Sequence, residues 1–153
     1  MILSLDPVLV LKPLFEADQM ALEPRQLIPD AIRYTFCLET ENYARGYDDI
    51  QEQMESRGYE MYLSKNSWDD TEYKGINTRR VTPDGQRFEV QFHTPESFHA
   101  KQHVTHSAYE QLRNPRTGDE ERLELEAFQR EVSSWIRVPD GATDIPDFKK
   151  EGF

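Results

Sequence analysis

One short segment of the sequence alternates hydrogen-bonding side chains with large apolar ones. The polar residues are Arg87, Glu89, Gln91 and His93, and the apolar residues between them are Phe88, Val90 and Phe92. Because successive side chains of a β-strand point to opposite faces, the four polar groups share one face of a sheet. Such a face is either exposed to solvent or the floor of a polar site, and the pattern alone favours solvent exposure.

Three histidines form a second group that could do chemistry. His99, His103 and His106 follow each other at intervals of four and three residues, so in a continuous helix they share one face. Imidazoles that converge in this way can bind Zn²⁺, with Glu110 as the obvious fourth ligand. Thr105 can restart the helix and no cysteine is near, so the sequence favours three surface histidines over a zinc site.

The elements that must position these residues begin with a strand and a helix. Apolar residues alternate over 31–38 and predict a strand, with Asp30 at its entrance. Thr40 can then cap a helix whose apolar residues recur every three or four positions and which ends at Gly58. A second strand follows over 59–63, and a polar loop follows over 65–70.

The second half of the chain predicts a hairpin and then helices. Strands over 75–82 and 86–93 flank the turn sequence Pro-Asp-Gly at 83–85 and should pair antiparallel. Thr94 followed by Pro95 predicts a helix start, and Thr105 predicts another. A capping box at 117–120 opens a long helix over 117–137, after which residues 138–153 are expected to be extended. This order indicates an α+β domain, a mixed and mostly antiparallel sheet of about four or five strands with helices packed on it.

Composition limits the partners and the compartment. The chain has 153 residues, a formal net charge of −11 and one cysteine, so it forms a single domain without an internal disulfide. Cys37 lies in an apolar run and is expected to be a buried, inert thiol. The sequence has neither a signal peptide nor an apolar span, which predicts a cytoplasmic protein without membrane contact. The acidity argues against broad nucleic-acid binding, although four basic residues cluster at Lys74, Arg79, Arg80 and Arg87.

Five short segments, in the same order, resemble the synthetase domain of RelA/SpoT-type enzymes. They are residues 30–34, 65–68, 73–77, 88–94 and 105–109. The resemblance covers about 28–116, and the domain core is assigned to 30–116, preceded by a weakly patterned segment over 1–29. The run Gln-Phe-His-Thr-Pro-Glu-Ser-Phe at 91–98 is similar to the branch of the family found in phage head proteins and polymorphic toxins.

The resemblance implies transfer of the β,γ-pyrophosphate of ATP to the 3′-hydroxyl of an acceptor nucleotide, with Mg²⁺ as cofactor. Asp30 and Glu89 match the carboxylates of the family that hold the metal and activate the hydroxyl. Gln91, His93, His106 and Tyr109 fall on segments near the nucleotide. Arg33, Lys65, Lys74 and Arg87 are of the residue type that neutralises phosphate charge.

Three positions depart from the family pattern. Residues 1–29 contain only Lys12 and Arg25 as cations, where the family has basic residues that bind ATP. Guanine-specific members have a tyrosine directly after the glycine, and its ring stacks on the acceptor base. Here Ile76 follows Gly75, so Tyr73 on the other side of the glycine is the candidate for this stacking, and the resemblance does not imply a guanine acceptor. His93 replaces the usual arginine. The second hypothesis is therefore a catalytically degenerate member that keeps the fold as a nucleotide-binding or protein-interaction module.

The expected partners follow from these two hypotheses. ATP and a small nucleotide acceptor are favoured over tRNA, because a tRNA-binding enzyme would need a more extended basic surface. A toxin of this type would inhibit growth, would have a cognate antitoxin or immunity protein, and would act in the cytosol of the cell that receives it.

Overall fold

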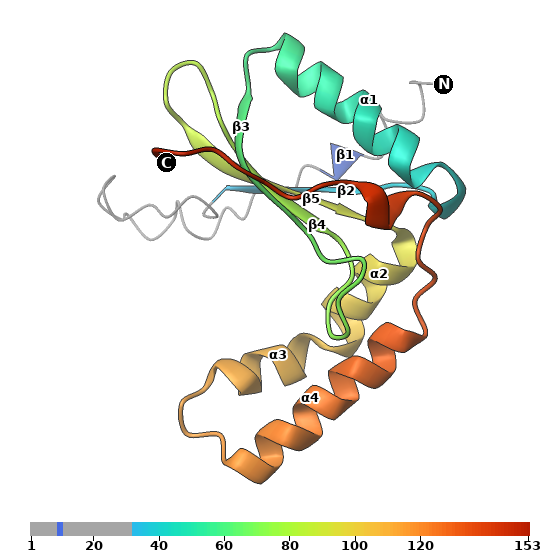
Figure 1. Ribbon diagram of the computed structural model, residues 1–153. Helices are drawn as coiled ribbons and strands as arrows, with labels where there is room; N and C mark the ends of the chain where they lie inside the picture. Colours follow the sequence, from blue (N-terminus) through green and yellow to red (C-terminus); the bar gives the residue numbers. More distant parts are fainter. Residues whose placement is uncertain (1–8, 11–31) are drawn as a thin grey trace.

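The computed structural model describes residues 9–10 and 32–153, which form one twisted sheet with helices on both sides (Figure 1). The strands are β1 (Leu9–Val10), β2 (Arg33–Cys37), β3 (Glu60–Asn66), β4 (Ile76–Val81), β5 (Arg87–His93) and β6 (Phe148–Lys149). Their order across the sheet is β1-β2-β5-β4-β3-β6. Only β2 and β5 pair in parallel among the described strands, and the other pairs are antiparallel.

This sheet confirms the predicted α+β class and its mixed, mostly antiparallel pairing. It has six strands instead of four or five, because two-residue strands pair at each edge. Neither edge strand is long enough to leave a pattern in the sequence, and β1 falls in the segment that carried no pattern. The four longer strands are the four that alternation predicted.

The helices lie on opposite sides of the sheet (Figure 1). They are α1 (Tyr43–Ser56), α2 (Pro95–His99), a π-helical turn η5 (Ala100–Val104), α3 (His106–Arg113) and α4 (Asp119–Ser134). Helix α1 crosses one face of the sheet. On the other side, α2 leads through η5 into α3 and α4, and these last two helices project away from the sheet. No helix in the described part of the chain is long and apolar enough to cross a membrane.

The hydrophobic core lies between α1 and the sheet. Tyr43, Tyr47 and Ile50 of α1 are buried against Phe88, Val90 and Phe92 of β5, as the apolar periodicities require. The Tyr43 hydroxyl donates to the carbonyl oxygen of Phe92 at 2.8 Å. Trp68 is fully buried beside Tyr43, which confirms that this loop tryptophan belongs to the core.

A buried arginine ties α1 to the sheet. Arg80 of β4 has no exposed surface and donates to the Gln51 side chain at 2.6 Å, to the Glu55 carboxylate at 3.1 Å and to the carbonyl oxygen of Tyr59 at 2.5 Å. Burial of a guanidinium is tolerated when most of its donors are satisfied, and both Nη atoms of Arg80 are bonded in this way, whereas its Nε has no hydrogen-bond partner among the described residues. Arg80 therefore stabilises the core and is separated by the sheet from the polar side of β5.

Helix and turn signals were confirmed in three places. Gly58 has a φ of 74° directly after α1, and Gly85 has a φ of 93° in the turn between β4 and β5, so both occupy conformations that favour glycine. Thr94 caps α2 by accepting from the backbone N–H of Ser97. The Ser97 hydroxyl accepts in return from the backbone N–H of Thr94, which closes a capping box.

Two predicted caps are wrong. Thr40 lies within a 3₁₀ turn, Thr40–Asn42, and α1 begins after it without a side-chain cap. Gly118 is the N-cap of α4, and the Thr117 hydroxyl donates instead to the carbonyl oxygen of Gln111 at 2.5 Å. In both cases the chain enters the helix from a turn that tertiary contacts determine.

The predicted loop over 65–70 also needs correction, because β3 continues to Asn66. Lys65 and Asn66 pair with Asn77 and Ile76 of β4, and this pairing extends the strand beyond its apolar residues. The Asn66 amide then donates to the carbonyl oxygens of Ala142 and Ile145 at 2.7 and 2.8 Å. These bonds attach the tail to the sheet, and the tail contains a 3₁₀ turn, Ala142–Asp144, before β6.

Candidate functional site

A carboxylate lies at the centre of the sheet surface opposite α1, which we call the Glu89 face. Parallel pairing of β2 and β5 sets Arg33 beside Glu89. The Nε and Nη2 atoms of Arg33 both donate to Glu89 Oε2, at 3.0 and 2.9 Å. The Glu89 side chain retains 6% of its exposure and that of Arg33 27%, so this pair is largely removed from solvent. The polar side of β5 is therefore lined by buried polar side chains and is not a solvated face.

The second oxygen of the Glu89 carboxylate accepts fewer hydrogen bonds than the first. Glu89 Oε1 accepts from the Gln91 amide at 3.2 Å, and Gln91 is itself buried two positions along the same face. An oxygen that holds one long bond to a neutral donor can still act as a base or bind a cation. Among the described residues, Arg33 therefore fixes one oxygen of Glu89, and the other accepts only the bond from Gln91.

Lys101 reaches the same face from the π-helical turn. Its Nζ atom donates to Gln91 Oε1 at 2.5 Å. The pKa of the Lys101 ammonium is lowered to about 8, mainly by burial and also by the positive charge of Arg33, whereas the carboxylate of Glu89 opposes this shift. Two cations therefore lie beside one carboxylate in this part of the sheet.

Beyond Gln91, the Glu89 face continues as a series of hydrogen-bonded side chains. The His93 ring has no exposed surface, and its Nδ1 and Nε2 atoms lie 2.8 Å from the Ser97 hydroxyl and 3.0 Å from the Tyr73 hydroxyl. The Tyr73 hydroxyl also donates to the Asn77 side chain at 3.0 Å. Burial lowers the pKa of His93 to about 3, with Lys101 and Arg33 adding to the shift, so the imidazole is neutral at pH 7.

Gly75 makes this arrangement possible. Its φ is 150°, and a Cβ atom at this position would lie 2.8 Å from Cε1 of His93 and 3.2 Å from the Tyr73 hydroxyl. Any larger residue would push the loop away from β5, and the contact between Tyr73 and His93 would be lost. The resemblance placed Tyr73 against an acceptor base. In the structure, the Tyr73 ring lies edge-on to His93 with 5.6 Å between centroids, and its hydroxyl contacts His93 and Asn77.

The structure brings together Arg33, Glu89, Gln91, His93 and Tyr73 from the predicted set, and it places the other candidates elsewhere. Lys74 donates to the carbonyl oxygens of Trp68 and Asp70, so its ammonium closes the loop over 67–75. Lys65 shares a cross-strand row with Asn77 and Gln91 but lies on β3, two strands away from β5.

Arg87, His106 and Tyr109 lie at the periphery. The Arg87 guanidinium stacks over the rings of Tyr62 and Phe153, at 5.3 and 5.4 Å from their centroids. His106 pairs with Glu110 at 3.2 Å on the exposed side of α3. Tyr109 is 52% exposed and carries the Arg113 guanidinium over its ring, although it is near enough to Tyr73 to raise the pKa of that phenol.

The histidine trio does not converge. His99 and His103 have ring centroids 5.1 Å apart, whereas His106 turns to Glu110. Within residues 9–10 and 32–153, no three side chains of the types that bind metals come together. The π-helical turn explains this outcome, because it changes the helical phase between His103 and His106.

Asp30, the other predicted carboxylate, lies outside the described residues. Glu89 is therefore the single described member of the proposed Mg²⁺ pair. Its donor chemistry suits the ion, because Mg²⁺ prefers hard oxygen ligands and usually takes one or two protein carboxylates. Glu89 Oε1 and the carboxylate of Asp30 are the atoms that would hold it.

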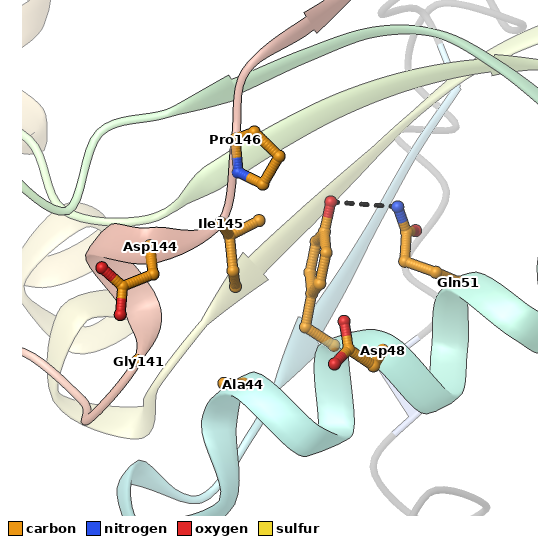
Figure 2. Close-up of a pocket in the computed structure, with 8 residues that line it drawn as sticks. Ala44, Asp48, Gln51, Gly141, Asp144, Ile145 and Pro146 are labelled. Carbon is orange, nitrogen blue, oxygen red and sulfur yellow. Dashed lines mark hydrogen bonds between the residues drawn. The ribbon is translucent and has the colours of Figure 1, made fainter.

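A separate hollow of about 550 Å³ lies on the other side of the sheet, between α1 and the tail (Figure 2). Its lining includes Asp48, Gln51, Asp144 and Ile145, and the Gln51 amide donates to the Tyr47 hydroxyl at 2.9 Å. None of the described residues that line it is positively charged. The hollow is unsuited to phosphate groups for this reason, and it is distinct from the Glu89 face.

Sequence reasoning missed Lys101, and one signal could have indicated it. Ser97 touches His93, and in a helix the residue four positions later lies on the same side. That residue is Lys101. Cys37 is only partly buried, which is less than predicted, although burial raises the pKa of its thiol.

Solved structures support the fold assignment, although no model of a known protein family and no curated protein sequence matches the chain. The small alarmone synthetase 2 from Bacillus subtilis superposes with a TM-score of 0.50 and 14% identity, over 79% of this chain and 68% of that one. The protein smu.1046c from Streptococcus mutans UA159 superposes with a TM-score of 0.51 and 12% identity, over 82% and 70%. The type VI effector Tas1, solved with its immunity protein, gives a TM-score of 0.48 and 18% identity, over 78% and 72%.

The superpositions on smu.1046c and on the small alarmone synthetase 2 agree with the resemblance found in the sequence. The chain has the fold of RelA/SpoT-type alarmone synthetases.

Proposed function

We propose that the protein transfers the β,γ-pyrophosphate of ATP to the 3′-hydroxyl of a small nucleotide. The observation that carries this proposal is the Glu89 carboxylate, which Arg33 fixes through one oxygen on the polar face of an alarmone-synthetase fold. The Glu89 face combines a carboxylate with two cations, and phosphoryl-type transfer requires these two kinds of group.

In the proposed reaction, the 3′-hydroxyl oxygen of the acceptor attacks the β-phosphorus of ATP. The bond between the β-phosphorus and the oxygen that bridges to the α-phosphate breaks, so AMP leaves and the acceptor gains a 3′-diphosphate. Glu89 Oε1 takes the hydroxyl proton, because Arg33 already occupies the other oxygen. With Glu89 acting as the base in this step, Asp30 would hold Mg²⁺, which would neutralise phosphate charge when bound.

The assignment can be tested with purified protein, ATP, Mg²⁺ and each of GDP, GTP, ADP and AMP in turn. We expect one acceptor to gain a diphosphate in amounts equal to the AMP released, as separated by anion-exchange chromatography. Glu89→Gln and Asp30→Asn should each lower the rate by about 100- to 10,000-fold, the range for loss of an acid–base group. Glu110→Gln is a matched control, because Glu110 is an exposed glutamate. Absence of transfer to every acceptor, or full activity in Glu89→Gln, would contradict the proposal.

The degenerate module is the second candidate, and the surroundings of Lys74 and His93 favour it. Lys74 is bound to loop carbonyls, and His93 is neutral, so neither adds a free positive charge. This candidate predicts that ATP binds without turnover. Calorimetric titration with ATP, run beside the transfer assay, distinguishes the two functions.

A growth-inhibitory role with an immunity partner is a further part of the proposal, and it is supported by the resemblance of the sequence to the toxin-associated branch. Induced expression in bacteria should slow growth, and Glu89→Gln should restore it. Equal toxicity of the wild type and Glu89→Gln would show that the toxicity does not depend on this site.

A further inference from the structure

The π-helical turn after α2 carries Lys101 into the proposed site. A wide turn closed by the bond from the Thr105 N–H to the Ala100 carbonyl oxygen, 2.9 Å, separates α2 from α3. Turns of this kind are uncommon and recur at functional sites. Lys101 leaves this turn with its aliphatic part half-buried and its ammonium at Gln91 Oε1.

A second cation lies near Lys101. Among the described residues, Arg33, Cys37 and Glu89 interact electrostatically with Lys101, and Lys101 in turn acts on His93. Arg33 carries positive charge, Glu89 carries negative charge and His93 is neutral, so the described groups around Lys101 include one other cation and one carboxylate. Because Arg33 already binds the carboxylate, Lys101 donates to a neutral amide within the described residues.

Partial burial of a cation is costly unless an anion compensates it. An ammonium group is a compact charge with three donors, and it binds phosphate oxygens as a point charge. The amide oxygen of Gln91 holds the ammonium where a phosphate oxygen could replace it. The chain as a whole carries a net charge of −11, so two cations close together on this face contrast with its overall composition.

We infer that Lys101 binds a phosphate group of the nucleotide in the proposed site and exchanges its Gln91 partner for a phosphate oxygen. This inference rests on the proposed function in that it takes the ligand to be a nucleoside polyphosphate. It adds Lys101, which lies in the turn after α2, to the phosphate-binding residues predicted from the sequence.

The test measures binding apart from turnover. ATP and inorganic pyrophosphate are titrated calorimetrically into the wild type, Lys101→Met, Lys101→Arg and Lys149→Met. Lys101→Met should weaken both ligands by about 10- to 100-fold, the range for one charge-assisted hydrogen bond. Lys101→Arg should recover part of this loss. Lys149→Met removes the same charge from an exposed position on β6 and should bind within about twofold of the wild type.

Chemical modification gives a readout that a structural role would not change. Acetic anhydride acylates accessible amines, and mass spectrometry of the peptides gives the rate at Lys101 and Lys149 in the wild-type protein. Saturating ATP should slow acylation of Lys101 at least about fivefold and leave Lys149 unchanged, since a bound phosphate shields the amine it contacts. This measurement uses no variant, so it decides the question even where Lys101→Met fails to fold.

The inference is overturned when Lys101→Met binds ATP as the wild type does, or when ATP gives Lys101 no protection. Its failure is distinct from failure of the proposed function. Protection of Lys101 without transfer to any acceptor supports this inference and refutes the transfer reaction. Normal transfer by Lys101→Met supports the reaction and refutes a phosphate contact at Lys101.

Discussion

The two faces of β5 are buried by different means. On the α1 side, Phe88, Val90 and Phe92 pack against aromatic rings, and the Tyr47 and Phe92 centroids are 4.8 Å apart. On the other side, Glu89 and Gln91 are buried among charged and polar groups. One face gains stability from apolar area, whereas the other retains ionised groups whose burial costs free energy. The comparison indicates which face stabilises the fold and which face serves the ligand.

The strongest test of this difference uses two neighbours on β5. Phe92→Ala should lower the free energy of unfolding by about 3–5 kcal/mol, because removal of a large buried ring leaves a cavity in the packed core. Gln91→Ala should lower it by about 1 kcal/mol, since it removes two hydrogen bonds of modest net value. Urea unfolding followed by circular dichroism measures both. Equal losses would show that the polar face contributes as much stability as the core.

The two arginines of β4 give the next test. Arg80→Met should cost about 2–4 kcal/mol, because it removes several buried hydrogen bonds to α1 and to Tyr59. Arg79→Met is the matched change at the next position, which is partly exposed on the other face, and its effect on unfolding should be small. A small effect of Arg80→Met on the free energy of unfolding would contradict a stabilising role for Arg80.

Stability should also depend on pH through His93. The pKa of His93 falls from 6.5 to about 3 in the folded protein, so between these values the unfolded chain binds the additional proton. Stability is therefore lost as the pH decreases below about 6.5, by about 2 kcal/mol at pH 5 relative to pH 7.

Urea titrations at pH 7 and pH 5 measure this loss, and two histidine variants serve as controls. His93→Gln should remove this component of the pH dependence. His99→Gln, at an exposed position, should retain it. An unchanged pH dependence in His93→Gln would assign the effect to other groups.

The smallest expected effects come from one hydroxyl on each face. Tyr43→Phe loses the bond to the Phe92 carbonyl oxygen, and Tyr73→Phe loses the contacts to Asn77 and His93. Each should cost about 1 kcal/mol in stability. Only Tyr73→Phe should also weaken ATP binding in calorimetry, because its ring adjoins the Glu89 face. Weaker ATP binding in Tyr43→Phe would show that the two faces are coupled.

The strand pattern around Glu89 was predictable because alternation is a local property of an extended chain. The hairpin turn at 83–85 and the cap at Thr94 were equally local, since glycine and short polar side chains set backbone geometry within a few residues. The entrances to α1 and α4 were not predictable in this way, because Thr40 lies inside a 3₁₀ turn and the Thr117 hydroxyl donates to Gln111.

The sequence by itself determined the α+β class, the core periodicities and the polar residues that share one side of β5. Only the tertiary structure decided that this side is buried, because exposure depends on what packs over a strand and not on its alternation. Lys74 and Lys101 illustrate the reason. Their charges are the same, but the loop carbonyls engage Lys74 and the π-helical turn brings Lys101 to Gln91. The position of a flexible cation depends on contacts between segments distant in sequence, and these exist only in the folded chain.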